Sequence, residues 1–362
     1  MKPIKIFVDC HKFDEDLQGI TTYLKGIYVE MTFKKNIVFY FVSYYPEKLK
    51  TVFGEKENIH YLKYTSKNKY YRLIFDAPRL IKLYNIDYAH FQYVIPPFKF
   101  CKYIITIHDV LFLDFPEYFP LPYRLINKFL FRFGAKNSNF ILTVSDYSKE
   151  RIEKHFEVKD VVVTPNAVNS VFFDEYDKEK AVQEVYQKFG FQNYWLFTSR
   201  WEPRKNHELV LKAFVEGSFY QDYNLVFIGK KAILNKKFKE LFDDLSPNIK
   251  NKIYILENID DYNMLNLLRA ARLFIYPSFA EGFGIPPIEA IASKIPTICS
   301  NTTAMSDFVF IKDGFFNPYD INDFYKILEN FNYNTLEDKK AQLKKQYHWN
   351  KSASILESLI TK

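Results

Sequence analysis

Glycine, cysteine and long apolar runs are all scarce in this chain of 362 residues. Its ten glycines nowhere form a Gly-x-Gly-x-x-Gly turn, so the common dinucleotide-binding fingerprint is excluded. The three cysteines are odd in number and widely spaced, which argues against a disulfide framework and against a cysteine-ligated metal. No apolar run approaches the roughly 20 residues of a membrane-spanning helix, and the short, charged segment Met1–Val8 predicts a strand and not a secretory signal. We therefore expect a cytoplasmic protein without disulfides.

The residues that are abundant indicate a folded protein with anionic partners. Hydrophobic residues make up 48% of the chain and aromatic residues 19%, which is typical of a packed globular protein. The length allows two α/β domains with separate cores. The net charge of +7 favours phosphates or anionic lipid headgroups as partners, although an excess of lysine that keeps the protein in solution explains the total equally well. The cations are scattered or gathered in one loop, which disfavours nucleic acid.

The segment Ser278–Ala292 organises the rest of the chain. It follows the strand-like run Leu273–Tyr276 and opens a helix, whose first turn accommodates two prolines. Gly282 and Gly284 stand two residues apart here, although glycine is rare elsewhere. Glycine lets a backbone approach a ligand closely, and the N-terminus of a helix offers unpaired N–H groups to an anion. The pattern therefore predicts an anion-binding turn.

Two carboxylates flank this turn. Glu281 precedes the helix and Glu289 is expected in its first turn, with seven residues between them. This spacing lets the two side chains reach opposite ends of a ligand whose diphosphate lies at the glycines. We interpret the segment as a nucleotide-sugar site; the alternative is an ordinary strand–turn–helix with surface glutamates.

With its internal Gly-Phe-Gly and Pro-Pro, the segment resembles the donor-site motif of the family-4 glycosyltransferases, which are retaining enzymes of the two-domain GT-B fold. The resemblance implies that Glu281 holds sugar hydroxyls and that Glu289 binds ribose hydroxyls. It also implies that the backbone of Gly282, Phe283 and Gly284 meets the donor diphosphate.

The fold that the resemblance implies is α/β, with two Rossmann-like parallel-sheet domains that face each other across a cleft. The resemblance extends over nearly the whole chain and is strongest from residue 195 to 301. We place an acceptor-side domain at residues 1–170 and a nucleotide-sugar-binding domain at residues 171–344. A helix over residues 345–362 is expected to cross back to the first domain, as part of a continuous helical segment Leu336–Ile360.

Near the N-terminus, the strand Ile4–Asp9 leads into a loop and a helix, the order that places a site at the carboxyl end of a strand. In the resembled family this loop faces the donor phosphates, which makes Gly19 a diphosphate-binding candidate. The run Asp14–Asp16 looks like a metal-binding pair of carboxylates. Loop carboxylates before a helix are more often solvated or interact with the helix dipole, so we expect no metal site.

A strand over Tyr103–Ile107 runs into His108 and Asp109. An isolated histidine is more often structural than catalytic. The string Thr-Ile-His-Asp, followed by Pro-Glu-Tyr-Phe, resembles the acceptor-side loop of the family. It implies a catalytic role for His108, in contact with the donor sugar near the reacting centre. Asp109 is a candidate to orient the ring.

A predicted helix from Pro122 to Lys136 carries cations at a strict spacing of four, namely Arg124, Lys128, Arg132 and Lys136. Its other faces hold the apolar residues Leu125, Phe129, Leu130 and Phe133. Two interpretations stay open. The cations form either a patch that meets a membrane surface or a lipid diphosphate, or the solvated face of a core helix.

In the second half, the strand Trp195–Thr198 leads into a loop with three cations within six residues. A guanidinium suits two phosphate oxygens, and a lysine adds a point charge. We therefore predict Arg200 and Lys205 as ligands of the donor diphosphate and Arg204 as a structural contact. A solvated charge cluster is the alternative.

The resemblance implies a metal-independent retaining glycosyltransferase. It would move a hexose from GDP-mannose or a UDP-sugar to a glycan or polyprenyl-diphosphate-linked acceptor of a surface polysaccharide. The nucleotide base would lie against Asn258 and Ile259, the donor would be a substrate, and no cofactor is expected. Any membrane contact would be peripheral, at the inner face. Two alternatives stay open: a nucleotide-sugar 2-epimerase, and a non-catalytic nucleotide-sugar-binding subunit.

Overall fold

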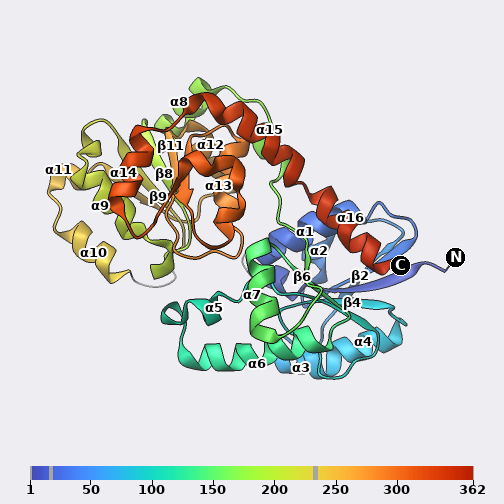
Figure 1. The fold of residues 1–362 in the computed structure, drawn as a ribbon. Helices are drawn as coiled ribbons and strands as arrows, with labels where there is room; N and C mark the ends of the chain where they lie inside the picture. The colour runs from blue at the N-terminus through green and yellow to red at the C-terminus, as the bar shows by residue number, and fades with distance from the viewer. Residues whose placement is uncertain (1, 16–18, 231–234, 362) are drawn as a thin grey trace. The chain divides into compact units, whose positions relative to one another are not determined.

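The computed structural model describes residues 2–15, 19–230 and 235–361. The chain forms two compact units, one of Met1–Ala167 with His348–Lys362 and the other of Val168–Tyr347 (Figure 1). Each unit is a parallel sheet with helices on both faces. Among the described residues, no helix combines the length and the apolar character that crossing a bilayer requires.

The first unit contains a sheet of seven parallel strands in the order β3-β2-β1-β4-β5-β6-β7. The strand order reverses between β1 and β4, which are hydrogen-bonded neighbours. Buried parallel strands read as apolar runs because helices cover both of their faces. The strands are β1 (Ile4–Asp9), β2 (Ile37–Ser43), β3 (Ile59–Lys63), β4 (Tyr88–Gln92), β5 (Lys102–Thr106), β6 (Phe140–Thr143) and β7 (Val162–Val163).

Helices pack on both faces of this sheet because alternate residues of a strand point to opposite sides. Tyr40 of β2 shares a buried apolar cluster with Phe131 of α6 on one face. Phe39 and Phe41 of the same strand contact Tyr28 of α1 on the other face. The helices of the unit are α1 (Gly19–Met31), α2 (Pro46–Phe53), α3 (Lys69–Tyr71), α4 (Ala77–Leu83), α5 (Leu111–Asp114), α6 (Leu121–Asn137), α7 (Asp146–Phe156) and α16 (Trp349–Ile360).

The second unit contains six parallel strands in the order β10-β9-β8-β11-β12-β13. Its strand order reverses between β8 and β11, and ligands of such sheets bind outside the carboxyl ends of the strands at this switch point. The strands are β8 (Tyr194–Thr198), β9 (Asn224–Ile228), β10 (Ile253–Leu256), β11 (Leu273–Tyr276), β12 (Thr297–Ser300) and β13 (Phe315–Phe316). The helices are α8 (Lys178–Phe189), α9 (His207–Glu216), α10 (Lys236–Asp243), α11 (Pro247–Lys250), α12 (Asp261–Ala270), α13 (Ile285–Ala292), α14 (Ile321–Glu329) and α15 (Leu336–Gln346).

The prediction of one continuous helical segment over Leu336–Ile360 is wrong. The structure has two helices there, α15 and α16, separated by Tyr347 and His348. His348 has an extended backbone, and its side chain accepts a hydrogen bond from the N–H of Lys351 at 3.2 Å, which caps α16. The new helix packs in the first unit: the Trp349 ring lies over Gly26, where a Cβ would come within 2.1 Å of it. The cap at His348 therefore begins a new helix inside a segment that the sequence predicts as helical throughout.

Candidate active site

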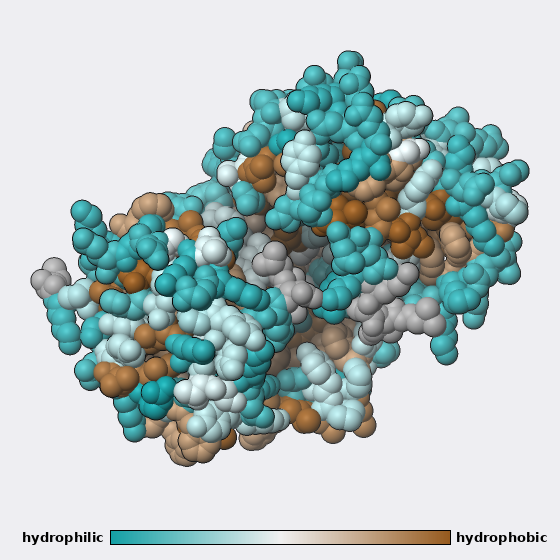
Figure 2. Space-filling model, turned by 180° about the vertical axis from the view of Figure 1, so that it is seen from behind, coloured by the Kyte–Doolittle hydropathy of each residue, from teal (hydrophilic) through white to brown (hydrophobic). Residues whose placement is uncertain are grey.

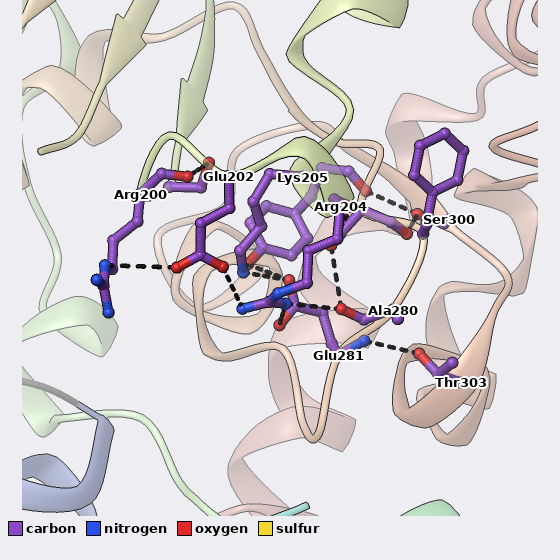
Figure 3. A network of polar contacts seen from close by, with 12 residues as sticks. Arg200, Glu202, Arg204, Lys205, Ala280, Glu281, Ser300 and Thr303 are labelled. Atoms are coloured by element: carbon purple, nitrogen blue, oxygen red, sulfur yellow. Dashed lines mark hydrogen bonds and ion pairs between the residues drawn. The ribbon is translucent and has the colours of Figure 1, made fainter. Parts of the chain in front are cut away.

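Two loops meet at the switch point of the second sheet. One follows β8 and contains a single helical turn, Pro203–Lys205, before α9. The other follows β11 and ends at Gly284, the cap residue of α13. The N–H of Phe279 donates to the carbonyl of Arg204 at 2.8 Å, which ties the two loops together. Residues that are more than 70 positions apart in the sequence thus form one polar cluster (Figure 3).

Glu281 lies at the centre of this cluster and is buried. Its Oε1 accepts hydrogen bonds from the Nζ of Lys205 and, at 2.9 Å, from the hydroxyl of Tyr276. Its Oε2 accepts from Nη1 of Arg204 at 3.1 Å. Burial alone would raise the pKa of the Glu281 carboxyl, but the charges of Lys205 and Arg204 outweigh it and lower that pKa to about 2. Glu281 is therefore a fixed, ionised acceptor at neutral pH.

The cations of the β8 loop make different contacts from one another (Figure 3). Lys205 is buried against Glu281, whereas the exposed Arg200 contacts Glu202 with its Nε 3.6 Å from a carboxylate oxygen. Arg204, which we predicted as a structural contact, lies between Glu202, at 2.9 Å, and Glu281. Burial lowers the pKa of Lys205, and the charge of Glu281 opposes that shift.

The glycine turn, residues 282–284, is held in place by its neighbours. Gly284 has φ 98°, a conformation that L side chains rarely adopt, and an added Cβ would lie 3.0 Å from Cγ of Met305. The ring of Phe283 is buried and packs on Phe308, with ring centres 5.3 Å apart, so its side chain belongs to the core. The N–H of Glu281 donates to Oγ1 of Thr303 at 2.9 Å. The turn is thus fixed from both sides at the start of α13.

Glu289 is the fifth residue of α13 and lies in its second turn, not in the first turn as predicted. It is half-buried, and burial together with the charge of Asp261 raises its pKa to about 7. Asp261 is the first residue of α12, and the segment that contains Asn258 and Ile259 lies directly before this helix. Asn258 is exposed with φ 55°, and Ile259 is half-buried. The roles of these residues at the ribose and the base stay predictions.

His108 belongs to the first unit, just past the end of β5, and is buried. Its Nε2 lies 2.8 Å from Oε1 of Gln92, and its ring contacts Tyr23 and Tyr93 with ring centres 5.0 and 5.3 Å away. Burial lowers the pKa of His108 to about 3, so the ring is neutral at physiological pH. Because the Gln92 carbonyl oxygen only accepts, Nε2 carries the proton and Nδ1 is left as the acceptor nitrogen.

Asp109, our candidate to orient this ring, accepts a hydrogen bond from the N–H of Leu111 at 3.2 Å. The hydrogen bond that fixes the His108 tautomer is donated by its Nε2 to Oε1 of Gln92. The polar contacts continue from Gln92 to His90, whose Nδ1 lies 2.7 Å from the hydroxyl of Tyr28. The histidine is therefore held by a buried polar chain that runs into the sheet.

The remaining candidates lie at the carboxyl end of β1. Gly19 is the first residue of α1 and is exposed. Asp14 accepts hydrogen bonds from the N–H groups of Tyr44 and Tyr45, at 2.8 and 2.9 Å, and so serves to hold the segment after β2. Asp16, the other carboxylate of the suspected metal pair, lies outside the described residues. Within residues 2–15, 19–230 and 235–361, no three His, Cys, Asp or Glu side chains converge as a metal site.

Comparison with known proteins connects this arrangement to a family. Residues 22–171 match the family model described as Glycosyltransferase Family 4, and residues 178–346 match the model described as Glycosyl transferases group 1. The first match lies almost wholly in the first unit and the second match in the second unit. The chain belongs to the family-4 glycosyltransferases. The recognition made from the donor-site motif is confirmed.

Curated relatives of this chain include two O-antigen proteins. The chain is 30% identical over 233 residues to O-antigen chain mannosyltransferase B of Escherichia coli, covering 62% of this chain and 60% of the relative. It is 26% identical over 226 residues to O-antigen chain mannosyltransferase RfbU of Salmonella typhimurium, with the same coverage of 62% and 60%. The chain therefore matches about three fifths of the length of these relatives.

Solved structures confirm the predicted fold class, the GT-B fold with two Rossmann-like parallel-sheet domains. A glycosyltransferase from Rickettsia africae superposes with a TM-score of 0.73 at 19% identity, and each chain is covered over 100% of its length. WaaG, described as a glycosyltransferase involved in lipopolysaccharide biosynthesis, superposes with a TM-score of 0.69 at 14% identity, covering 98% of this chain and 99% of that one. HepE of Anabaena, in complex with UDP and glucose, gives a TM-score of 0.72 at 13% identity, covering 99% and 100%.

Sequence reasoning missed three contacts of this glycosyltransferase's candidate site. Arg204 binds Glu281, a partner that the sequence did not indicate. Tyr276 is the last residue of an apolar strand, and its hydroxyl reaches both Lys205 and Glu281. Gln92 is the one that a sequence signal could have revealed, because polar residues at alternate positions of a buried strand, as in Tyr-Ala-His-Phe-Gln, need partners inside the fold.

Replacing Gly229 by alanine is expected to destabilise the second unit by about 3 kcal/mol or more. Gly229 follows β9, and an added Cβ would lie 1.7 Å from the carbonyl oxygen of Ser199, a backbone atom at the start of the cation loop. Gly190→Ala is the matched control: its φ of 79° also disfavours alanine, but nothing lies within 4 Å of the added Cβ. Its cost should stay at about 1 to 2 kcal/mol. Urea denaturation compares the two, and equal losses would contradict the close contact of the loops.

Proposed function

We propose that this protein transfers a hexose from a nucleoside-diphosphate sugar to a glycan or lipid-linked acceptor during the biosynthesis of a surface polysaccharide. The relatives described as O-antigen mannosyltransferases support this class of product and GDP-mannose as a donor. The UDP and glucose complex of HepE, which has the same fold, supports a UDP-sugar as the alternative donor. The proposal places the reaction on the cytoplasmic side of the membrane, at its inner face, where the three free cysteines stay reduced.

The observation that carries the proposal is the state of Glu281. A buried, ionised carboxylate is held by Lys205 and Arg204 directly before a glycine turn and the N-terminus of α13. A carboxylate accepts strong hydrogen bonds from sugar hydroxyls. Cations and the start of a helix stabilise the negative charge that develops on a leaving diphosphate. In the proposed complex, one cluster of residues both binds the sugar hydroxyls and stabilises the leaving diphosphate.

The proposed chemistry is retaining and does not require a metal ion. The bond between the anomeric carbon and the diphosphate oxygen breaks, and the acceptor oxygen bonds to the same carbon on the same face. The acceptor's proton passes to the departing phosphate oxygen. The negative charge of the nucleoside diphosphate is stabilised by Lys205, Arg204 and Arg200. The backbone of residues 282–284 also binds it, and so does the backbone of Gly19, as proposed from the sequence.

Two residues position the sugar in this proposal. Glu281 accepts from its hydroxyls, and because it is ionised it favours the positive charge of an oxocarbenium-like centre. His108 is neutral, with Nδ1 as its acceptor nitrogen, so it contacts the donor sugar as a hydrogen-bond acceptor and not as an acid. Gln92 fixes that tautomer.

Donor affinity is expected to rise with pH around neutrality because of Glu289. In the proposal its carboxylate accepts from the ribose hydroxyls, while Asn258 and Ile259 flank the base. Its pKa of about 7 means that it is mostly protonated at pH 6 and mostly ionised at pH 8. The KM for the donor should therefore fall about tenfold between these pH values. Initial rates measured against donor concentration show this, and Glu289→Gln should remove the dependence. A wild-type KM that does not change with pH would contradict the role of Glu289.

The proposed function is tested by following one nucleotide sugar and an oligosaccharide acceptor by NMR, with and without EDTA. The expected products are free nucleoside diphosphate and a glycosidic bond with the anomeric configuration of the donor. Conversion of the donor sugar at its second carbon, without a new glycosidic bond, would instead indicate a 2-epimerase. An inverted product would contradict retention, and loss of turnover in EDTA would contradict metal independence. Donor binding without any turnover would indicate a binding subunit.

A further inference from the structure

Helix α6 of the first unit has an unusual composition for the cover of a sheet. Its 17 residues include four cations and no Asp or Glu. The buried residues are Phe131, Gly134 and Ala135, all near its C-terminal end. They face the sheet closely: an added Cβ at Gly134 would lie 2.5 Å from Cδ1 of Ile105. The N-terminal two thirds of the helix is thus attached to the unit by few buried side chains.

Several apolar residues in the first half of α6 point outward. Leu125 is 61% exposed and Phe129 70% exposed. The cause is the helical period: with Phe131 and Ala135 turned to the sheet, residues four apart at 125 and 129 lie together on the outer side. The large exposed apolar residues of the helix are Leu121, Tyr123, Leu125, Ile126 and Phe129.

A row of cations runs beside this apolar surface. Lys128, Arg132 and Lys136 follow one another at four-residue intervals, so they lie along one edge of the exposed side. Arg132 and Lys136 contact the carboxylate of Glu157, in the case of Lys136 at 3.5 Å. Long cationic side chains at such an edge keep their charged ends in a polar layer while their stems cover apolar surface.

The first unit has a second group of exposed apolar residues, in the segment before α4. In Figure 1, α6 runs along the outside of the first unit, on the side that also carries α3 and α4. Leu73 and Leu80, from the helical segments around α4, belong to the same buried cluster as Phe131, so these helices and α6 cover one face of the sheet. The segment before α4 exposes Tyr70, Tyr71, Ile74 and Phe75. Most of the surface in Figure 2 is hydrophilic, and hydrophobic residues reach it in separate groups.

We propose that α6 and the segment 70–75 dock the first unit on an anionic lipid bilayer. The exposed apolar side chains would enter the boundary between headgroups and acyl chains, and the cationic row would lie at the lipid phosphates. A second copy of the chain fits this surface less well, because a two-fold contact through α6 would bring its four cations against the same four cations. The inference rests on the proposed function in one respect: a lipid-linked acceptor is presented at such a surface.

Vesicle flotation of the full chain tests the docking without any nucleotide sugar. Wild-type protein is expected to float with vesicles that contain about 30% anionic lipid, at least tenfold more strongly than with neutral vesicles, and to lose most of this binding at about 0.5 M salt. Leu125→Glu combined with Phe129→Glu should reduce binding to anionic vesicles at least tenfold. Lys128→Glu, which reverses one charge in the row, should reduce it by a similar factor.

Val309→Glu is the matched control, because Val309 is 65% exposed but lies in the second unit. It should bind vesicles like the wild type, and all variants should keep the wild-type melting temperature. Equal binding to neutral and anionic vesicles, or unchanged binding of the double variant, would overturn the docking. So would a wild-type dimer that the double variant loses, since the surface would then pair two copies. Transfer to a water-soluble acceptor should be unchanged in the double variant, so a failure of docking and a failure of the transferase assignment are separate results.

Discussion

Replacing Glu281 by alanine is expected to lower kcat/KM for sugar transfer by about 10²- to 10⁴-fold. The substitution removes the acceptor for the sugar hydroxyls and the negative charge near the anomeric carbon. It also leaves Lys205, and in part Arg204, without a carboxylate in a buried place. Removing one partner of a buried ion pair costs about 3 to 5 kcal/mol of folding free energy. Activity must therefore be compared at equal concentrations of folded protein, measured by thermal unfolding.

A second variant separates catalysis from folding. Glu281→Gln keeps the shape and an acceptor oxygen but removes the charge, so it should fold better than the alanine variant and still lose most of its activity. Glu216→Gln is the control, because Glu216 is an exposed carboxylate at the end of α9 with Lys212 3.8 Å away. Near-normal turnover in Glu281→Ala, with the donor bound as in the wild type, would refute the assignment.

Replacing Lys205 by methionine is expected to lower kcat/KM by about 10²-fold or more and to weaken donor binding. Lys205 supplies charge for the diphosphate, and it is the largest influence that lowers the pKa of Glu281. Without it, burial raises the pKa of that carboxyl, and Arg204 and a hydrogen bond with Ser278 oppose the rise. Lys205→Arg should not restore activity, because a planar guanidinium does not fit the buried place of an ammonium. Lys212→Met, on the exposed side of α9, is the matched control.

The coupling of the two residues is measurable in the folding free energy as well. In a cycle of Lys205→Met, Glu281→Gln and the double variant, we expect a coupling of about 1 to 3 kcal/mol. The double variant should be more stable than the sum of the single losses predicts, because it leaves neither charge without the other. Additive losses would show that the contact between Nζ and the carboxylate does not persist in solution.

Much of the fold could be predicted because local rules decide it. The strand before the donor motif, the glycine turn and the start of α13 follow from an apolar run, two glycines and two prolines, and the structure has them at the predicted place. The helix beginning at Asp146 is capped by Ser145, which accepts from the N–H of Ser148 at 3.1 Å. Where a boundary shifted, as at α6, which the sequence predicts over Pro122–Lys136 and which spans Leu121–Asn137, the difference is one residue at each end.

The errors have physical causes that lie outside a local pattern. The break in the helical segment at residue 347 was not predicted. It depends on the His348 side chain, which caps α16, and on the packing of Trp349 against Gly26, which is distant in the sequence. Which side of α6 faces outward, a question that the sequence leaves open, depends on which of its two apolar sides the sheet accepts, and both sides have the same period.

In the candidate site, too, local patterns predict some features and contacts between distant segments decide others. The cation loop could be recognised from the sequence, but the pairing of Arg204 with Glu281 depends on how the β8 and β11 loops meet in space. The tautomer of His108 depends on Gln92, which reaches it only because β4 and β5 are neighbours in the sheet. Pairings between distant segments set both, so no local pattern could have shown them.

The most direct measurement is a thermal-unfolding panel with UDP, GDP, dTDP, ADP and NAD, each with and without EDTA. A ligand at about 100 times its dissociation constant stabilises the protein by about 2.7 kcal/mol, which raises the melting temperature by a few degrees. We expect one nucleoside diphosphate to give this shift in the melting temperature. EDTA should not change the shift, and the Lys205→Met variant should lose it. No shift with any nucleoside diphosphate, or a shift with NAD alone, would contradict a nucleotide-sugar site at Glu281 and Glu289.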